Sequence, residues 1–417
     1  MPYRVTMLSI GLWSQRLGRS FHYQDYRRYW LGCMLATTAF HMQSIVLGWQ
    51  MLEATGSAFW VGLVAFGYGL PFLILSPFTG VVADRMRRQR VMAVALFHAC
   101  LFSAGLASLT AFRQVLPWQI VLASFLLGSS FVLYAPARSA LLPNLVPGEM
   151  LLNASTITYS STRLMGFFST ALAGVLVEFT GEWPTLTIQA ILFSLAIPAF
   201  QRTKTNQADS VQSKPRPGHI LHAVRDVAAY LRHDQPSLLA LVLLSLVVVS
   251  IFTSFEKLMP VFVQSVLAAG ASTFGLMVGI FSFGIALTGF AMAAGGDTVP
   301  KGQAVVLSSV LSGCGLIVSA FVRSVELALG LLLLLGVIVG IYLTLTTVLF
   351  ESRPLDSVRG RVQSVWGMVW GVAPFVNLAA GAIAEQWGVT FTIAVGGAVG
   401  VILCLAIGLI GASLREL

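Results

Sequence analysis

A few ionisable side chains lie inside long apolar stretches of the sequence, where a charge is costly. Arg163 is the only formal charge between positions 153 and 177, and Glu256 and Lys257 stand together in TSFEKLMPVFV. A charge at the centre of a membrane span costs about 2.5–3.5 kcal/mol on insertion scales, so such residues face a protein interior or a water-filled cavity. His41, in TTAFHMQSIVLGWQ, adds a side chain that titrates near neutral pH.

The guanidinium of Arg163 suits an anionic or phosphate-bearing ligand, because its planar fork binds such groups through two parallel hydrogen bonds. The residue lies about ten positions into its apolar stretch, which places it about 15 Å deep at about 1.5 Å per residue. We therefore predict that Arg163 contacts the substrate. The alternative is that it forms a structural ion pair.

Glu256 is the only carboxylate well inside an apolar stretch. A carboxylate whose protonation depends on the side to which its cavity opens is what proton coupling requires. We predict that Glu256 contributes to substrate binding and to proton coupling, and that His41 assists in proton coupling. The alternatives are an ion pair of Glu256 with Lys257 near the outer surface and a histidine that only packs through a hydrogen bond.

Further polar side chains in the apolar stretches complete the predicted substrate site. Gln43 and Gln50 are seven positions apart and therefore share one face of a helix. Tyr159 and Asn377 add amphipathic character. The predicted substrate-binding residues are Arg163, Gln43, Gln50, Tyr159, Glu256 and Asn377.

The elements that position these residues follow from composition. Of the 417 residues 57% are hydrophobic and only 10% are charged, and the mean hydropathy is +0.84. Soluble domains are about 45–50% apolar and about 25% charged. A membrane span needs about 20 apolar residues, and helices satisfy their own backbone hydrogen bonds in lipid. The predicted transmembrane helices are 29–52, 58–82, 91–112, 118–141, 153–177, 185–201, 237–265, 271–294, 303–322, 327–349, 362–384 and 389–412.

The net charge of +9 is distributed according to membrane topology. If the N-terminus is inside, 21 of the 25 Lys and Arg residues fall on inward segments, whereas outward loops hold only Arg113 and Arg323. This asymmetry follows the positive-inside rule and places both termini in the cytoplasm. The basic balance thus indicates the topology of a multi-pass protein, with the lipid bilayer as partner and no nucleic acid. The short loops and the lack of targeting extensions suggest a bacterial inner membrane.

The chain divides into two similar halves. A polar linker separates the sixth and seventh spans, and Pro147 and Glu149 recur 207 positions later as Pro354 and Asp356. Such internal repeats are typical of secondary transporters. The predicted segments are a basic amphipathic N-terminal segment (1–28), an N-terminal six-helix bundle (29–201), a cytoplasmic linker with an interfacial helix (202–236), a C-terminal six-helix bundle (237–412) and a cytoplasmic tail (413–417).

The loop GVVADRMRRQRV, residues 80–91, resembles the signature Gly-x-x-x-Asp-Arg-x-x-Arg of the major facilitator superfamily. The segments APARSALLPNLVP, RGRVQS and PFVNLAAGAIAEQWG are similar to the drug:proton antiporter-3 branch, which includes siderophore exporters. The fifth span departs from drug-exporting members, because GFFSTALAG lacks their proline. The resemblance implies the major facilitator fold, which is an all-α membrane protein with twelve transmembrane helices in two pseudo-symmetric six-helix bundles.

The resemblance also implies a conformational latch on the cytoplasmic side. The N-terminus of a helix carries a partial positive charge and unpaired N–H groups, so a carboxylate can cap it. We predict that Asp84 caps the helix that starts near Gly360, and that the contact breaks when that side opens. The alternative is that the basic residues of this loop only set topology. The predicted latch residues are Gly80, Asp84, Arg85, Arg88 and Gly360.

These observations predict a monomeric secondary transporter that exports a small amphipathic or anionic molecule in exchange for protons. A lipid or lysophospholipid transporter without proton coupling is the alternative. No cofactor or metal is expected, because the four cysteines are scattered and no nucleotide-binding loop occurs. An enzyme is not expected, since neither a Gly-x-Ser-x-Gly nor a His-Glu-x-x-His motif is present.

Overall fold

The computed structural model describes residues 18–203, 232, 235–295, 300–353 and 359–410. For positions 76–85, 290, 293–295 and 359–368 it describes the backbone alone. The predicted interfacial helix of the linker, most of the N-terminal segment and the C-terminal tail therefore lie outside the described residues.

Twelve long helices make up almost all of the described chain, which confirms the predicted all-α class. Eleven of them are long and apolar enough to cross a membrane within the described residues, and α13 completes the set. The first half contains α2 (Gln24–Thr55), α3 (Ala58–Arg85), α4 (Arg88–Ala111), α5 (Pro117–Leu141), α6 (Gly148–Thr180) and α7 (Glu182–Gln201). The second half contains α9 (Pro236–Ser265), α10 (Ala271–Gly295), α11 (Lys301–Phe321), α12 (Val325–Ser352), α13 (Arg359–Trp387) and α14 (Val389–Ile410).

The first membrane helix starts five residues before its predicted boundary at position 29. Tyr26 and Tyr29 are fully buried, and the Tyr26 hydroxyl donates a hydrogen bond to the Ala154 carbonyl oxygen over 3.1 Å. Polar residues at this end are thus held by α6 rather than lying in a separate surface segment. A one-turn 3-10 helix, η1 (Gly18–His22), precedes α2.

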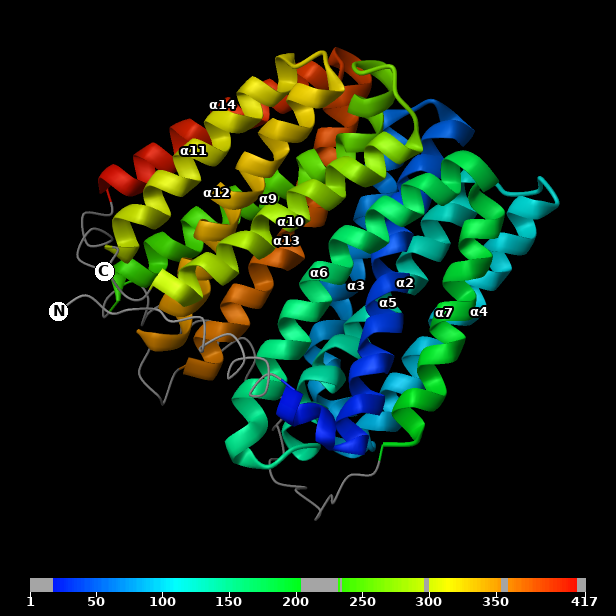
Figure 1. Ribbon diagram of the computed structural model, residues 1–417. Helices are drawn as coiled ribbons and strands as arrows, with labels where there is room; N and C mark the ends of the chain where they lie inside the picture. Colours follow the sequence, from blue (N-terminus) through cyan, green and yellow to red (C-terminus); the bar gives the residue numbers. More distant parts are fainter. Residues whose placement is uncertain (1–17, 204–231, 233–234, 296–299, 354–358, 411–417) are drawn as a thin grey trace, which may run out of the picture.

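The helices form two bundles that lie side by side (Figure 1). The N-terminal bundle consists of α2 to α7 and the C-terminal bundle of α9 to α14. Two helix pairs make the main contacts between the bundles, namely α6 with α10 and α3 with α13. In Figure 1, α6 and α10 diverge toward the end of the molecule at which α6 begins and α10 ends.

Small residues let the bundles approach closely at these two helix pairs. A Cβ atom added to Gly174 of α6 would lie 2.9 Å from the Cα atom of Gly275 in α10. A Cβ atom added to Gly62 of α3 would lie 3.0 Å from the Cα atom of Gly381 in α13. Backbone contact of this kind is how membrane helices associate when no hydrophobic effect drives them together.

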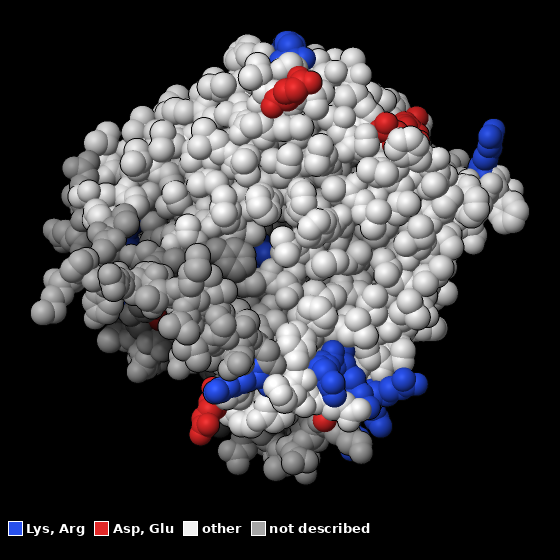
Figure 2. Space-filling model, viewed as in Figure 1, with Lys and Arg blue, Asp and Glu red and all other residues white. Residues whose placement is uncertain are grey.

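The two ends of the molecule differ in charge. The basic face, at which α2, α6 and α9 begin, carries Arg19, Arg28, Arg88, Arg138 and Arg202. The opposite face, at which α3, α7 and α10 begin, carries Glu53, Glu178, Glu182, Glu326 and Glu385. Figure 2 shows most of the visible Lys and Arg side chains gathered at one end of the molecule, with a few acidic side chains among them, and acidic side chains beside isolated basic ones at the other end.

Three of the connections on the opposite face are very short. Gly56 lies between α2 and α3, Gly181 between α6 and α7, and Gly388 between α13 and α14. Their φ angles are 64°, 87° and 84°, a region that glycine adopts without the strain of a Cβ atom. These glycines allow each helix to end and the next to begin within one or two residues.

Candidate functional site

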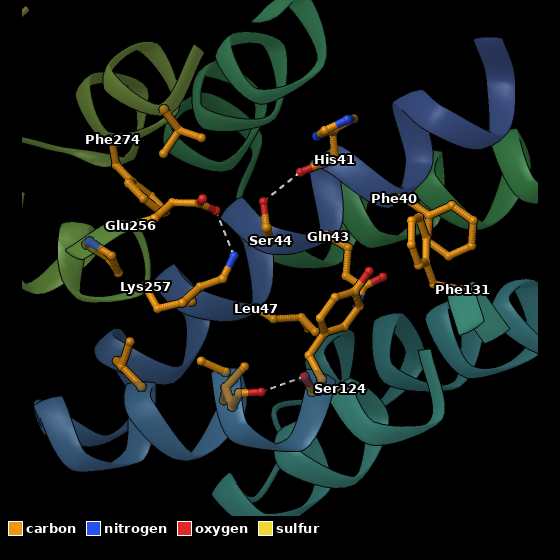
Figure 3. Close-up of a pocket in the computed structure, with 17 residues that line it drawn as sticks. Phe40, His41, Gln43, Ser44, Leu47, Ser124, Phe131, Glu256, Lys257 and Phe274 are labelled. Atoms are coloured by element: carbon orange, nitrogen blue, oxygen red, sulfur yellow. Dashed lines mark hydrogen bonds and ion pairs between the residues drawn. The ribbon is translucent and has the colours of Figure 1, made fainter. Parts of the chain in front are cut away.

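A cavity of about 240 Å³ lies between the two bundles. Helices α2, α3 and α5 line it from the N-terminal bundle, and α9 and α10 line it from the C-terminal bundle. Much of the wall is apolar or aromatic, with polar groups at a few places (Figure 3). The polar and charged lining residues are His41, Gln43, Ser44, Tyr68, Ser124, Glu256 and Lys257.

An ion pair is the only charged group in this lining. Lys257 Nζ lies 2.7 Å from Glu256 Oε1, and the two side chains are 28% and 31% exposed. Figure 3 shows the pair on the side of the cavity facing Ser44 of α2. Neighbouring residues on a helix do not normally face each other, so both side chains bend to meet. The structure thus places the predicted proton-coupling carboxylate in the cavity together with its sequence neighbour.

A proline one turn further along α9 shapes this part of the cavity. Pro260 lines the cavity and lacks the N–H that would bond to the carbonyl oxygen of Glu256. The backbone carbonyl of Glu256 therefore provides a second acceptor next to its carboxylate. This region of α9 can hold a cation, a proton or a hydrogen-bond donor.

Gln43 has the clearest unsatisfied hydrogen-bond acceptor in the cavity. Its side chain is 2% exposed, and within the part of the chain that the structure describes its Oε1 atom has no hydrogen-bond donor. A buried amide oxygen without a partner costs about 1–3 kcal/mol. A ligand with an N–H or O–H group would satisfy this oxygen, and Gln43 stays a predicted substrate residue that lines the cavity.

His41 connects the cavity to α6. Its ring packs against Gly166, since a Cβ atom added there would lie 3.4 Å from two of the ring atoms. The Ser44 hydroxyl donates a hydrogen bond to the His41 carbonyl oxygen over 3.0 Å. His41 lines the same cavity as Glu256 and Lys257. The structure therefore gathers the predicted proton-coupling residues in one region.

Arg163 lies on the exposed surface of α6 and does not line the cavity. Its guanidinium carbon stands 5.1 Å from the ring centroid of Tyr159, which is itself 61% exposed. This arrangement is a cation–π contact. Among the described residues no carboxylate forms an ion pair with Arg163. The two residues form a separate candidate anion site one helical turn from Gly166.

Two of the predicted substrate residues are held in contacts within a single bundle. The Gln50 amide nitrogen donates to Thr110 Oγ1 over 2.7 Å, and this contact joins α2 to α4. Asn377 Oδ1 accepts hydrogen bonds from the hydroxyls of Thr253 (3.1 Å) and Ser254 (2.9 Å), which join α13 to α9. Neither residue lines the cavity. Gln50 shares the face of Gln43 but lies two turns beyond it, where its amide reaches Thr110 near the end of α4.

The predicted latch falls largely outside the described side chains. Gly80, Asp84 and Arg85 lie in the last turns of α3, and Gly360 lies in the first turn of α13. Arg88 donates a hydrogen bond to the Ala140 carbonyl oxygen of α5, within the same bundle. The latch therefore stays a prediction.

Tyr68 lines the cavity although the sequence reasoning did not single it out. Its helix packs closely there, because a Cβ atom added to Gly67 would lie 3.1 Å from the carbonyl oxygen of Val121 in α5. The sequence GYG, a tyrosine between two glycines inside an apolar stretch, was the available signal. Small neighbours bring the helix close to its partners and leave the larger side chain to fill the space between them.

Two six-helix bundles with a mostly apolar cavity between them are the architecture of a membrane transporter of the major facilitator superfamily. The chain belongs to the family described as transmembrane secretion effector, whose sequence model matches residues 19–416.

Individual proteins are similar to this chain over most of its length. Macrolide efflux protein A of Streptococcus pyogenes is 23% identical over 381 residues, which cover 89% of this chain and 91% of that protein. The staphyloferrin A transporter of Staphylococcus aureus is 22% identical over 360 residues, covering 85% and 88%. A solved POT family transporter in complex with a thioalcohol-conjugated peptide has a TM-score of 0.75 at 12% identity, covering 93% and 96%.

Proposed function

We propose that the protein exports a small amphipathic molecule by alternating access, with entry of protons driving the export. The observation that carries this proposal is the cavity between the bundles, which combines the Glu256–Lys257 pair with the unpartnered Gln43 oxygen. Residues from both bundles line it, so a rocking motion of the bundles changes the side to which the cavity opens.

The chemistry of the cavity points to the kind of cargo. Aromatic and aliphatic walls bind an apolar body, whereas Gln43, Ser44 and Lys257 offer one acceptor, one hydroxyl and one cation. Such a site fits a molecule with an apolar part and a carboxylate or hydroxyl group. Relatives named for efflux of macrolides and for transport of staphyloferrin A support a cargo of this class.

Proton coupling follows from the ion pair. While Glu256 is ionised, its carboxylate pairs with Lys257 and can also accept a hydrogen bond from a hydroxyl group of the cargo. A proton that binds to Glu256 weakens both contacts. Proton binding and cargo binding therefore oppose each other at this carboxylate, as export in exchange for protons requires.

The proposed orientation of the protein in the membrane rests on the distribution of charge. The basic face collects arginines, whereas five of the described acidic residues lie on the opposite face (Figure 2). Under the positive-inside rule the basic face is cytoplasmic, and both termini are then in the cytoplasm of a bacterial inner membrane. The bundles meet on the opposite face and diverge toward the basic face, so the cavity of this conformation receives cargo from the cytoplasm.

The alternative is a lipid transporter, and the position of Arg163 favours it. Arg163 and Tyr159 are exposed on α6, outside the cavity, where a headgroup phosphate could be bound while acyl chains stay in the bilayer. Proteoliposomes separate the two functions. Lipid movement that is independent of a pH gradient supports the alternative, whereas gradient-driven uptake of a macrolide or of staphyloferrin A into inside-out vesicles supports the exporter.

Substitution of Glu256 in the ion pair tests the proposed proton coupling. We expect Glu256→Gln to abolish the dependence of export on the pH gradient, because the amide binds no proton at this site. Glu149→Gln, an exposed carboxylate in the first turn of α6, is the matched control and keeps the dependence. Gradient-driven export by Glu256→Gln at the rate of the control would refute the proton-coupling role.

A further inference from the structure

Glu178 reaches from the N-terminal bundle to the start of a helix in the C-terminal bundle. Its Oε2 atom accepts a hydrogen bond of 2.7 Å from the backbone N–H of Ser272, the second residue of α10. Glu178 lies near the end of α6, on the opposite face. The first N–H groups of a helix have no partner within it, so this carboxylate caps α10 from the other bundle.

Glu385 makes the corresponding contact in the reverse direction. It lies near the end of α13, and its Oε2 atom accepts hydrogen bonds from the Ser57 hydroxyl (2.9 Å) and from the backbone N–H of Phe59 (3.2 Å). Phe59 is the second residue of α3. A carboxylate of the C-terminal bundle therefore caps a helix of the N-terminal bundle.

The two caps occupy equivalent positions in the internal repeat. Glu385 follows Glu178 by 207 positions, which is the spacing already found between Pro147 and Pro354. Each glutamate also lies four positions, or about one helical turn, beyond a glycine of the inter-bundle contacts, Gly174 in α6 and Gly381 in α13. The cap and the close glycine contact thus form one unit that occurs twice.

Both carboxylates are exposed on the opposite face and break their contacts only when the bundles separate there. Their partners are backbone groups at helix starts, which also carry the positive end of the helix dipole. An exposed carboxylate at a helix N-terminus contributes a few-fold to an equilibrium, and two of them act together on the same opening. The closed conformation of this face is therefore favoured by charge as well as by packing.

We propose that Glu178 and Glu385 are paired inter-bundle caps that hold the opposite face closed, and that their release accompanies opening of the transporter on that side. The inference rests on the alternating-access motion of the proposed function, but not on the cargo or on proton coupling. The two caps bias a two-state element, because their contacts exist in one state and not in the other.

The test measures the opening directly, without cargo. Spin labels are placed on cysteines that replace Gln114 and Arg323, exposed residues in opposite-face loops of the N-terminal and C-terminal bundles. The four native cysteines are removed first. Electron–electron double resonance of the purified protein in lipid nanodiscs then gives the populations of the short and long label distances.

Glu178→Ala and Glu385→Ala are each expected to raise the ratio of long to short distances about three- to fivefold, and the double variant about tenfold or more. Glu326→Ala is the matched control, because Glu326 lies in the first turn of its own helix α12 on the same face. Its distance distribution is expected to equal that of the parent.

Two outcomes would overturn the proposal. One is a double variant that keeps the parent distribution while it elutes as a folded, monodisperse protein. Another is an equal shift in Glu326→Ala, which would mean that any lost acidic charge on this face opens it. Because no cargo is present, a negative export assay leaves this measurement unaffected, and the two proposals fail separately.

Discussion

Replacement of Gly174 by alanine tests whether the bundles must touch backbone to backbone when the opposite face is closed. The new Cβ atom would lie 2.9 Å from the Cα atom and 3.1 Å from the nitrogen atom of Gly275. Both neighbours are backbone atoms, so no side chain can rotate away and the helices α6 and α10 must separate. Overpacking of this kind costs about 1–3 kcal/mol.

The cost applies only to the closed conformation, since the two helices part there when that face opens. The gain in helix propensity from alanine, about 0.8–1.0 kcal/mol, applies to both conformations and cancels. A difference of about 1–3 kcal/mol corresponds to about a 5- to 150-fold rise in the ratio of open to closed molecules. The spin-label pair at positions 114 and 323 measures this ratio.

Two further glycines supply the controls. Gly105 of α4 has open space around its added Cβ atom, so Gly105→Ala should leave the distance distribution unchanged. Gly284 of α10 packs against Gly336 of α12 inside the C-terminal bundle, so Gly284→Ala should lower the melting temperature without opening the face. The reasoning is refuted if Gly174→Ala keeps the parent distribution, or if Gly284→Ala shifts it equally.

Three other variants test the candidate site. Arg163→Ala should reduce transport of a phosphate-bearing lipid at least tenfold if the lipid alternative holds, and should leave export of a cargo bound in the cavity nearly unchanged, because Arg163 lies outside the cavity; equal loss for both would mean a structural role. Gln43→Leu should raise the KM about tenfold without lowering the melting temperature, since it removes a buried acceptor that has no protein partner; an unchanged KM would exclude Gln43 as a cargo contact. Asn377→Ala should destabilise the protein by about 0.5–1.5 kcal/mol in thermal unfolding, because the hydrogen bonds between α13 and α9 are lost while Thr253 and Ser254 keep the Ser250 carbonyl oxygen as an acceptor, and an unaltered melting temperature would contradict this.

The sequence predicted the helices well, because the length of an apolar run is set by bilayer thickness rather than by any one contact. It predicted their ends less well. The helix α2 extends to Gln24 because the hydroxyl groups of Tyr26 and Tyr29 bond to backbone carbonyls of α6 and α5, and composition alone does not show such bonds.

The candidate site was predictable only in part. His41, Gln43 and Glu256 meet in the cavity because polar side chains in apolar runs turn toward the interior. However, the tilt of each helix and the position of the residue along it decide whether a side chain reaches the cavity or packs inside one bundle. Gln50 on α2 reaches α4, and Asn377 on α13 reaches α9 within its own bundle.

The single-glycine connections of the opposite face restrict the motion that transport requires. Gly181 ties α6 to α7, and Gly388 ties α13 to α14, with no slack between one helix and the next. Neither helix of such a hairpin can slide along its neighbour without unwinding a turn. Each of these two hairpins must swing as a stiff unit, and any compliance has to come from other connections of the chain.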